Sequence, residues 1–321
     1  MSSPPPKNPN KTIVLLKRSA YELAILHGNS ALEKQIQAQG PSTSRLLVAH
    51  SEHTLGIEKL KKILLEFFTG VEYFYRENLE DPFFLARFRE AENIITYGGD
   101  GTFLWGAKHA LPHQNLISIN SSPSTSSGFY SCGSIVDFQE FLRYGGFAKE
   151  FNGAKAKEML EYISTIKYTV SDPSNQKIVN EGVAINDLLV SGVHPASSAK
   201  YWLMESGFSR TQISSGLWIC SPLGSHGAVR SAGGIRQPSD DARLQWKVRE
   251  LYLKPNVSPF DSKNNFQGFV PQNETLEVVS NMRQGLISPD GDTNSIPFGF
   301  EQRLICRLNY RALRLFSRKS K

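Results

Sequence analysis

The segment Gly98-Gly99-Asp100-Gly101-Thr102 places three glycines and one carboxylate directly after the apolar run Ile94 to Tyr97. Glycines in such a turn let backbone amides approach a polyphosphate closely, because no Cβ intervenes and positive φ is accessible. A carboxylate held among these amides could accept the proton of a hydroxyl that attacks phosphorus. The alternative is an ordinary strand-to-helix turn in which Asp100 is the helix N-cap. The segment alone therefore points to phosphoryl transfer without establishing it.

A second polar segment, Asn186-Asp187, interrupts the apolar run from Ala184 to Val190. Adjacent residues of a strand point to opposite faces, so only a bulge or a strand end would let both side chains reach one ligand. Buried amides and carboxylates need hydrogen-bond partners, and ribose hydroxyls are natural ones. On its own, however, a turn that interrupts a strand explains this pair better.

A third segment, Ser221-Pro222-Leu223-Gly224-Ser225, follows another apolar run and continues through His226-Gly227-Ala228 to Ser231-Ala232-Gly233-Gly234. We expect a strand to end at Ser221-Pro222 and a helix to begin near Ser225, whose N-terminal amides would favour an anionic ligand. The small residues Gly227, Ala228 and Ala232 would let an adenine or a neighbouring helix pack closely.

The three segments, in this order and spacing, resemble the NAD kinase family. Gly98 to Thr102 matches the first motif of that family, and Asn186-Asp187 is similar to its Asn-Glu/Asp motif. Ser221 to Ser225 is similar to its Thr-Pro-x-Gly-Ser motif. Ser118-Ile119-Asn120 and Leu286 to Asp292 resemble a strand ending in Gly-x-Asn and a late Asp-Gly turn. The resemblance spans roughly residues 94 to 316, and the combination of motifs is more specific than any one of them.

This resemblance implies transfer of the γ-phosphate of ATP to the 2′-hydroxyl of the adenosine ribose of NAD or NADH, with a divalent metal, usually Mg²⁺. It implies that Asp100 is the base or orienter of that hydroxyl. It also implies an N-terminal Rossmann-like domain, a C-terminal β domain and assembly as a dimer or tetramer. The residues it implies for nucleotide binding are Gly98, Gly99, Gly101, Thr102, Asn120, Asn186, Asp187, Ser221, Gly224, Ser225, His226, Gly227, Ala228 and Ser231.

The chain departs from the family pattern at two places. His226-Gly227-Ala228 stands where the family commonly has Thr-Ala-Tyr, and Ser215 stands where many members have Asp. Both features resemble a divergent branch that includes plant NADH kinases and mitochondrial NAD kinases. The preference for NAD or NADH and the phosphoryl donor therefore stay open. His226 is expected to be a polar residue at a helix start, with contact to phosphate when protonated as the alternative.

Two other functions compete with an NAD(H) kinase. A diacylglycerol- or sphingosine-type lipid kinase shares the Gly-Gly-Asp-Gly turn, but the two later segments favour NAD. A non-catalytic dinucleotide-binding protein would keep the fold without turnover, and the presence of Asp100 argues against it.

The elements that must position these segments change character along the chain. Strands at Thr12–Lys17, Leu46–His50 and Leu116–Asn120 and helices at Tyr21–Gln39, Gly56–Phe68, Phe84–Glu92 and Phe103–Ala110 predict a doubly wound parallel sheet. After Gly153, short alternating runs separated by turns predict an antiparallel β domain, with a long loop at 255–274. We expect a disordered tail at 1–11, an α/β domain at 12–150 and a β-rich domain at 151–302, with a last strand near 303–316 that returns to the first domain.

The composition limits the classes of partner and the cellular location that we expect. The net charge of +6 comes from seven basic residues that follow Glu301, so we expect a solvated basic end and no nucleic-acid partner. No apolar run is long enough to span a membrane or to act as a secretory signal, and three dispersed cysteines suit a reducing compartment, so a cytoplasmic location is expected. Pro112 between His109 and His113 argues against a metal site there.

Overall fold

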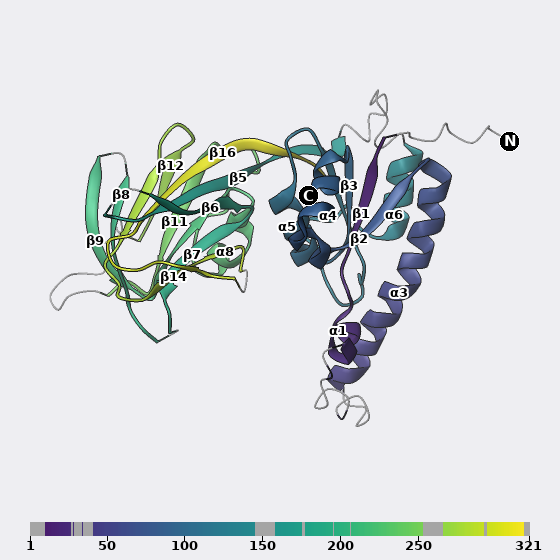
Figure 1. The fold of residues 1–321 in the computed structure, drawn as a ribbon, viewed down its shortest axis with the longest axis horizontal. Helices are drawn as coiled ribbons and strands as arrows, with labels where there is room; N and C mark the ends of the chain where they lie inside the picture. The colour runs from purple at the N-terminus through teal and green to yellow at the C-terminus, as the bar shows by residue number, and fades with distance from the viewer. Residues whose placement is uncertain are drawn as a thin grey trace. The chain divides into compact units, whose positions relative to one another are not determined.

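The computed structural model describes residues 10–26, 28, 34, 41–144, 158–174, 177–194, 196–205, 207–252, 266–291 and 294–317. The chain forms two compact units, one of Met1–Glu161 with Leu313–Lys321 and one of Tyr162–Ala312 (Figure 1). The sequence predicted domains at 12–150 and 151–302, with the last strand returning to the first. Nearly all of the expected tail at 1–11 lies outside the described residues.

The first unit contains a parallel sheet with the strand order β2-β1-β3-β4. The end of the last strand, β16, extends it, because Arg314–Phe316 pairs in parallel with β4. Every residue of β1, β3 and β4 is buried, as expected for strands covered on both faces. Strand bounds in this sheet are β1 Thr12–Leu16, β2 Val71–Tyr75, β3 Asn93–Gly98, β4 Asn115–Asn120 and β16 Arg303–Phe316.

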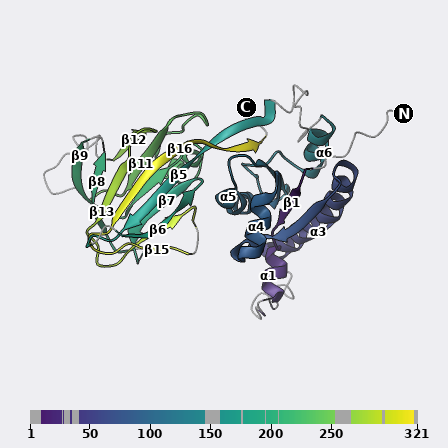
Figure 2. The same cartoon turned by 45° about the horizontal axis from the view of Figure 1, so that its top comes forward.

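Helices cover both faces of this parallel sheet (Figures 1 and 2). Apolar residues of α3 and α6 share one core with alternate residues of β1, β3 and β4. On the other face, α5 packs against β1 and β3, and the close approach is possible because Gly106 lies against Leu15 and Thr96. The helices are α1 Ala20–Leu26, α3 Pro41–Phe67, η1 (a 3₁₀ helix) Arg76–Glu80, α4 Pro82–Glu90, α5 Asp100–His109 and α6 Ile135–Arg143.

The second unit is built from strands, most of them antiparallel neighbours. One sheet has the order β12-β11-β10-β7-β14-β15 and is antiparallel throughout. In the other, β16 pairs with β13, β13 with β8 and β8 with β9, while β5 pairs with β6. One apolar core, which includes Trp246, Tyr201 and Phe298, draws residues from both sheets. The remaining bounds are β5 Leu160–Ser171, β6 Ile178–Ala184, β7 Asp187–Gly192, β8 Ala199–Glu205, β9 Phe208–Ser214, β10 Gly216–Cys220, β11 Arg243–Arg249, β12 Gln267–Pro271, β13 Leu276–Ser280, β14 Gly285–Pro289 and β15 Ile296–Pro297.

The fold class is confirmed at the level of a mixed α/β protein with a parallel-containing sheet and a separate antiparallel sheet. Two local expectations are wrong. Leu46–His50 is not a strand but part of the 27-residue helix α3. Gln267–Pro271 is not loop but the edge strand β12, whereas 255–265 lies outside the described residues. Of the expected helix at Tyr21–Gln39, the part up to Leu26 is helical and belongs to α1. Nearly all of the remainder lies outside the described residues.

Within the described ranges, no helix combines the length and the apolar character that crossing a bilayer requires. Cys132, Cys220 and Cys306 are all free and buried.

Candidate functional site

The glycine–aspartate segment forms the junction between β3 and α5. Strand β3 ends at Gly98, Gly99 is the N-cap, and Asp100 is the first residue of α5. The turn closes through hydrogen bonds from the Thr102 and Phe103 amides to the Gly99 carbonyl. Asp100 therefore stands at the carboxyl end of a parallel strand and at a helix N-terminus, where the helix dipole favours negative charge.

The three glycines of this turn differ in what the protein itself requires. A Cβ at Gly98 would lie 2.2 Å from Thr102 Oγ1, so packing alone explains that glycine. A Cβ at Gly99 would meet nothing closer than Ser126 Oγ at 3.9 Å, and one at Gly101 would meet nothing within 4 Å. Neither of these two positions needs glycine for internal packing. Their missing side chains leave the turn open to an approaching ligand, as the phosphate hypothesis requires.

The loop after β4 packs beside this turn. Gly98 and Asn120 occupy paired positions in β3 and β4, and the Ser121 amide donates to the Gly98 carbonyl. The Asn120 amide side chain accepts from the Ser122 amide at 3.0 Å and donates to the Ser126 carbonyl at 2.8 Å. Asn120 thus shapes the serine-rich loop that faces Asp100. From that loop, the Tyr130 amide donates to Asp100 Oδ1 at 3.2 Å.

In the second unit, Asn186 and Asp187 lie at a break between two strands. Strand β6 ends at Ala184 and β7 begins at Asp187, so the pair stands at a strand end. The carboxylate of Asp290 accepts hydrogen bonds from the consecutive amides of Ile185, Asn186 and Asp187, at distances between 2.6 and 3.2 Å. Asp290 has φ +51° and its own amide donates to the Asp187 carbonyl. This clamp fixes the backbone that carries both predicted side chains.

The Ser221–Ser225 turn holds the same break from the other side. The Ser221 hydroxyl donates to the Ile185 carbonyl at 2.6 Å and accepts from the Gly224 amide, while the Ser221 amide donates to the Asn186 carbonyl. A Cβ at Gly224 would lie 1.9 Å from the Asn186 oxygen. The Ser225 hydroxyl donates to the Pro222 carbonyl and is fully buried. Ser221, Gly224 and Ser225 are therefore engaged in packing this turn against 185–187.

The expected helix beginning near Ser225 is much shorter than predicted. Gly224–His226 is one 3₁₀ turn and Ala228–Ser231 is a four-residue helix, so the argument from a long helix N-terminus does not hold here. Gly227 joins these two pieces, while Ala228 and Ser231 are exposed. His226 Nε2 lies 3.0 Å from the Gln237 carbonyl, to which it donates.

Asp187 is a buried acid whose pKa is raised. Only 6% of its surface is exposed. Burial, together with the neighbouring carboxylate of Asp290, raises the pKa of Asp187 from 3.8 to about 7. Near neutral pH such a carboxyl can both donate and accept hydrogen bonds, which suits recognition of sugar hydroxyls.

Sequence reasoning missed three residues that organise this cluster. It quoted Asp290 within a late turn but gave it no role. It did not single out Gln237 or Gln245, which are at most 1% exposed. The Gln237 amide donates to Ser225 Oγ, and the Gln245 side chain exchanges hydrogen bonds with both backbone groups of Ile235. The one available signal was the amide side chain of Gln245 between the apolar residues Leu244 and Trp246 of β11.

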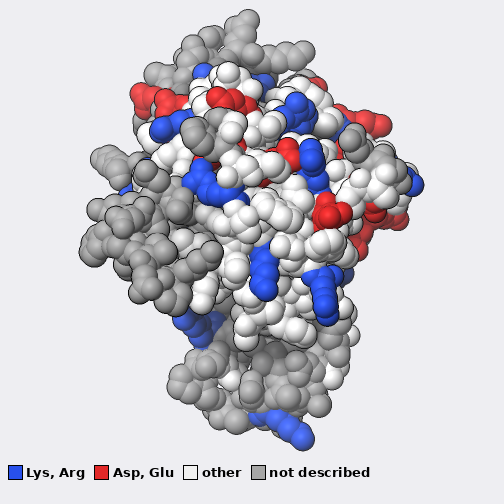
Figure 3. All heavy atoms as spheres, turned by 90° about the vertical axis from the view of Figure 1, so that its left-hand side faces the viewer, with Lys and Arg blue, Asp and Glu red and all other residues white. Residues whose placement is uncertain are grey.

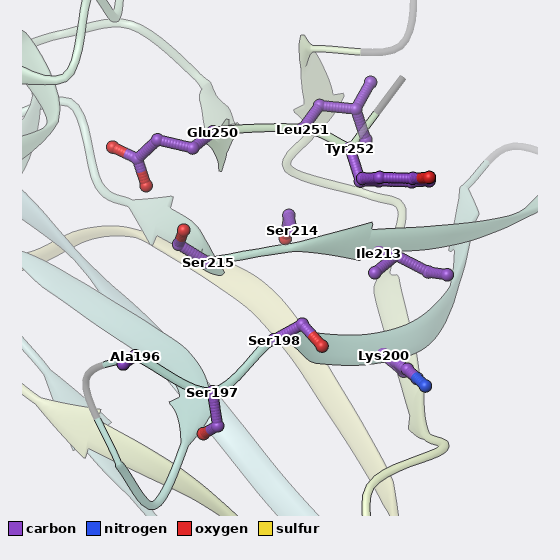
Figure 4. Close-up of a pocket in the computed structure, with 10 residues that line it drawn as sticks. All are labelled: Ala196, Ser197, Ser198, Lys200, Ile213, Ser214, Ser215, Glu250, Leu251 and Tyr252. Atoms are coloured by element: carbon purple, nitrogen blue, oxygen red, sulfur yellow. The ribbon is translucent and has the colours of Figure 1, made fainter. Parts of the chain in front are cut away.

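A cavity of about 580 Å³ in the second unit involves none of the predicted site residues (Figure 4). It is lined by the start of β8 with Lys200, by Ser214 and Ser215, and by Glu250 and Tyr252 after β11. Ser214 and Ser215 precede β10, whereas Ser221 follows it, so this cavity lies at the opposite end of that strand. Ser215, one of the departures from the family pattern, faces this cavity instead of the Ser221 turn.

Charged groups are spread over the face drawn in Figure 3, where blue and red side chains are interspersed. Among the described residues, no group of three or more His, Cys, Asp or Glu side chains is placed to share a metal ion. His109 packs against Trp105 instead, and burial lowers its pKa to about 4.

Comparison with known proteins gives two sequence relatives. No protein-family profile matches the chain. A probable NADH kinase of Oryza sativa subsp. japonica is 28% identical over 214 residues, which cover 63% of this chain and 63% of that protein. An NAD kinase of Methanopyrus kandleri is 25% identical over 227 residues, covering 68% and 72% of the two chains. The matched region thus spans less than two thirds of the rice protein.

Two solved structures share the fold. The NAD kinase of Archaeoglobus fulgidus in complex with ATP matches with a TM-score of 0.57 at 15% identity, covering 96% of this chain and 94% of that one. Yeast NADH kinase complexed with NADH matches with a TM-score of 0.62 at 12% identity, covering 99% and 89%.

Proposed function

We propose that this chain, a member of the NAD kinase family, transfers the γ-phosphoryl group of ATP to the 2′-hydroxyl of the adenosine ribose of NAD or NADH, giving NADP or NADPH. Support comes from the two sequence relatives, named as kinases of NADH and of NAD, and from the two solved structures, which hold ATP and NADH. The observation that carries the proposal is the Asp100 carboxylate at an open glycine turn. A diacylglycerol- or sphingosine-type kinase is not favoured, because both sequence relatives act on the nicotinamide dinucleotide.

In this reaction the 2′-oxygen attacks the γ-phosphorus while the bond to the ADP oxygen breaks. Asp100 accepts the proton that the attacking hydroxyl loses, and its helix-terminal position stabilises the carboxylate before transfer. The turn Gly98 to Thr102 holds phosphate oxygens through its backbone amides other than that of Thr102, which is bonded to the Gly99 carbonyl. Asn120 shapes the loop whose Tyr130 amide orients one Asp100 oxygen, which leaves the second oxygen for the substrate.

We assign recognition of the dinucleotide hydroxyls to Asn186 and Asp187. The Asp290 clamp and the Ser221 turn fix the backbone of this pair, so both side chains are positioned before ligand binds. Ser221, Gly224 and Ser225 act by supporting this backbone. Further proposed contacts with the nucleotide come from the exposed end of the same segment, at His226, Gly227, Ala228 and Ser231.

Mg²⁺ would enter as the complex with ATP. Magnesium is typically held by nucleotide phosphates and water with few protein carboxylates, which fits a turn that presents backbone amides and one carboxylate, Asp100. The metal would supply charge neutralisation at the phosphates. A Rossmann-like description of the first unit, a cytoplasmic location and a dimer or tetramer remain predictions from the sequence.

The test is purified full-length chain incubated with ATP and Mg²⁺ and offered NAD, NADH or a sphingoid base in parallel. We expect formation of NADP or NADPH, detected with an NADP-specific dehydrogenase, and no phosphorylation of the sphingoid base. Phosphorylation of the base alone would establish the lipid kinase instead, and binding of dinucleotide without turnover would establish a non-catalytic protein.

A further inference from the structure

Two cationic residues lie at the same edge of the parallel sheet as the glycine turn. Leu16, the last residue of β1, pairs with Tyr75 in β2 and with Tyr97 in β3. The next residues along these three strands are Lys17, Arg76 and Gly98. Neighbouring strands are about 4.8 Å apart. Lys17, the residue after β1, therefore lies about one strand spacing from the start of the turn that leads to Asp100.

Lys17 is a partly buried ammonium that the described structure leaves without a carboxylate. Burial and the Arg76 guanidinium lower the pKa of Lys17. No ion pair of Lys17 exists among the described residues, whereas Arg76 pairs with Glu77 at 2.9 Å. At the other end of the same strand, Lys11 pairs with Glu90 at 2.7 Å. Partly desolvated charges normally have partners, and the residues that the structure describes supply no anion for Lys17.

The backbone of Lys17 is held in place by a residue that also contacts the strand before the turn. Buried His53, from α3, donates through Nε2 to the Lys17 carbonyl at 3.0 Å. The ring of His53 stacks on Tyr97, and the Tyr97 hydroxyl donates to the His53 carbonyl. Tyr97 immediately precedes Gly98. The same buried histidine therefore contacts both Lys17 and the residue before the glycine turn.

We propose that Lys17 binds the β- and γ-phosphates of the donor nucleotide, which then extends along the sheet edge from the Gly98–Thr102 turn toward β1. This inference rests on the proposed function and names a binding residue that the sequence motifs did not include. Lys17 is the favoured cation because Arg76 is already paired and Arg18 lies over the Tyr75 ring, 4.2 Å from its centroid. A lysine acts on a phosphate as a compact, mobile point charge.

The test is Lys17→Met, with Lys11→Met as the matched control at the opposite end of β1. We expect the KM for ATP of Lys17→Met to rise roughly 10- to 100-fold, the loss of one charge-assisted contact, while the KM for NAD changes less than about 2-fold. Lys11→Met should keep both constants. Lys17→Arg should recover part of the ATP affinity, since it restores the charge without the same geometry.

Binding measurements separate this inference from the proposed reaction. By calorimetry, Lys17→Met should lose affinity for ATP and ADP but keep the affinity for AMP, which lacks the distal phosphates. Thermal melting checks that the variant is folded. Unchanged ATP affinity, or an equal loss for AMP, would overturn the role of Lys17. Normal ATP binding that depends on Lys17 in a protein with no NAD(H) kinase activity would instead uphold this site and refute the proposed function.

Discussion

Replacement of Asp187 by Asn should raise the stability of the second unit above neutral pH. The wild-type side chain is a carboxyl with 6% exposure whose pKa is raised to about 7, first by burial and then by Asp290. An amide of the same shape never ionises, so it avoids the cost of a buried negative charge. The backbone hydrogen bonds of residue 187 with Asp290 do not involve the replaced atoms and should remain.

The magnitude follows from proton linkage. The unfolded chain releases the Asp187 proton near 3.8, whereas the folded chain retains it until about 7. The contribution to stability is therefore fully present below the unfolded pKa and is lost as the pH rises through the folded pKa. The total loss is about 4 kcal/mol, of which ~2.5 kcal/mol falls between about pH 5 and pH 8.

The assay is urea unfolding of wild type and Asp187→Asn at both pH values, followed by tryptophan fluorescence. Three of the four tryptophans, Trp202, Trp218 and Trp246, lie in the second unit, so this signal mainly reports that unit. Other ionisable groups titrate alike in the two proteins, and their effects cancel in the difference. Parallel pH dependence of the two unfolding free energies would show that Asp187 is not a buried acid of raised pKa.

Two further substitutions test the same cluster. Ala228→Tyr should change the ratio of NAD to NADH turnover, because Ala228 is exposed where the family commonly carries an aromatic residue; an unchanged ratio in steady-state assays would mean that position 228 does not face the nucleotide. Gly224→Ala should destabilise the chain by roughly 1–3 kcal/mol, since its Cβ would lie 1.9 Å from the Asn186 carbonyl oxygen. Gly70→Ala is the control, because a Cβ there meets nothing within 4 Å, and equal melting temperatures of the two variants would contradict this account.

The alternation of buried strands and helices in the first unit was readable from local sequence. Strands β1, β3 and β4 are mostly apolar and buried throughout, the pattern of a sheet covered on both faces. The same local reasoning failed at Leu46–His50, because four apolar residues in a row are short enough to suit either a strand or one face of a long helix. Strands β2 and β9 were missed, and both pair on one side only, where polar residues are tolerated.

Parts of the candidate site that consist of neighbouring residues could be predicted from the sequence. Contacts that the fold makes between distant segments could not. The Asp100 turn and the Asn186-Asp187 pair are local features. The first is marked by its three glycines, and the second by two polar residues within an apolar run. The clamp by Asp290 joins residues about 100 positions apart, so no spacing rule announces it. Likewise Lys17 looks like an ordinary strand-end lysine until strand order sets it beside Gly98.

The measurement that most directly tests the central claim compares wild type with Asp100→Asn, using Asp81→Asn as control. Asp81 is the N-cap of α4, where Asn serves as well as Asp, so the control should keep full activity. Asp100→Asn should melt like wild type and bind ATP, yet form NADP(H) at least ~100-fold more slowly, the usual effect of losing a general base. A folded Asp100→Asn protein with near-wild-type turnover would contradict the assignment of proton acceptance to this carboxylate.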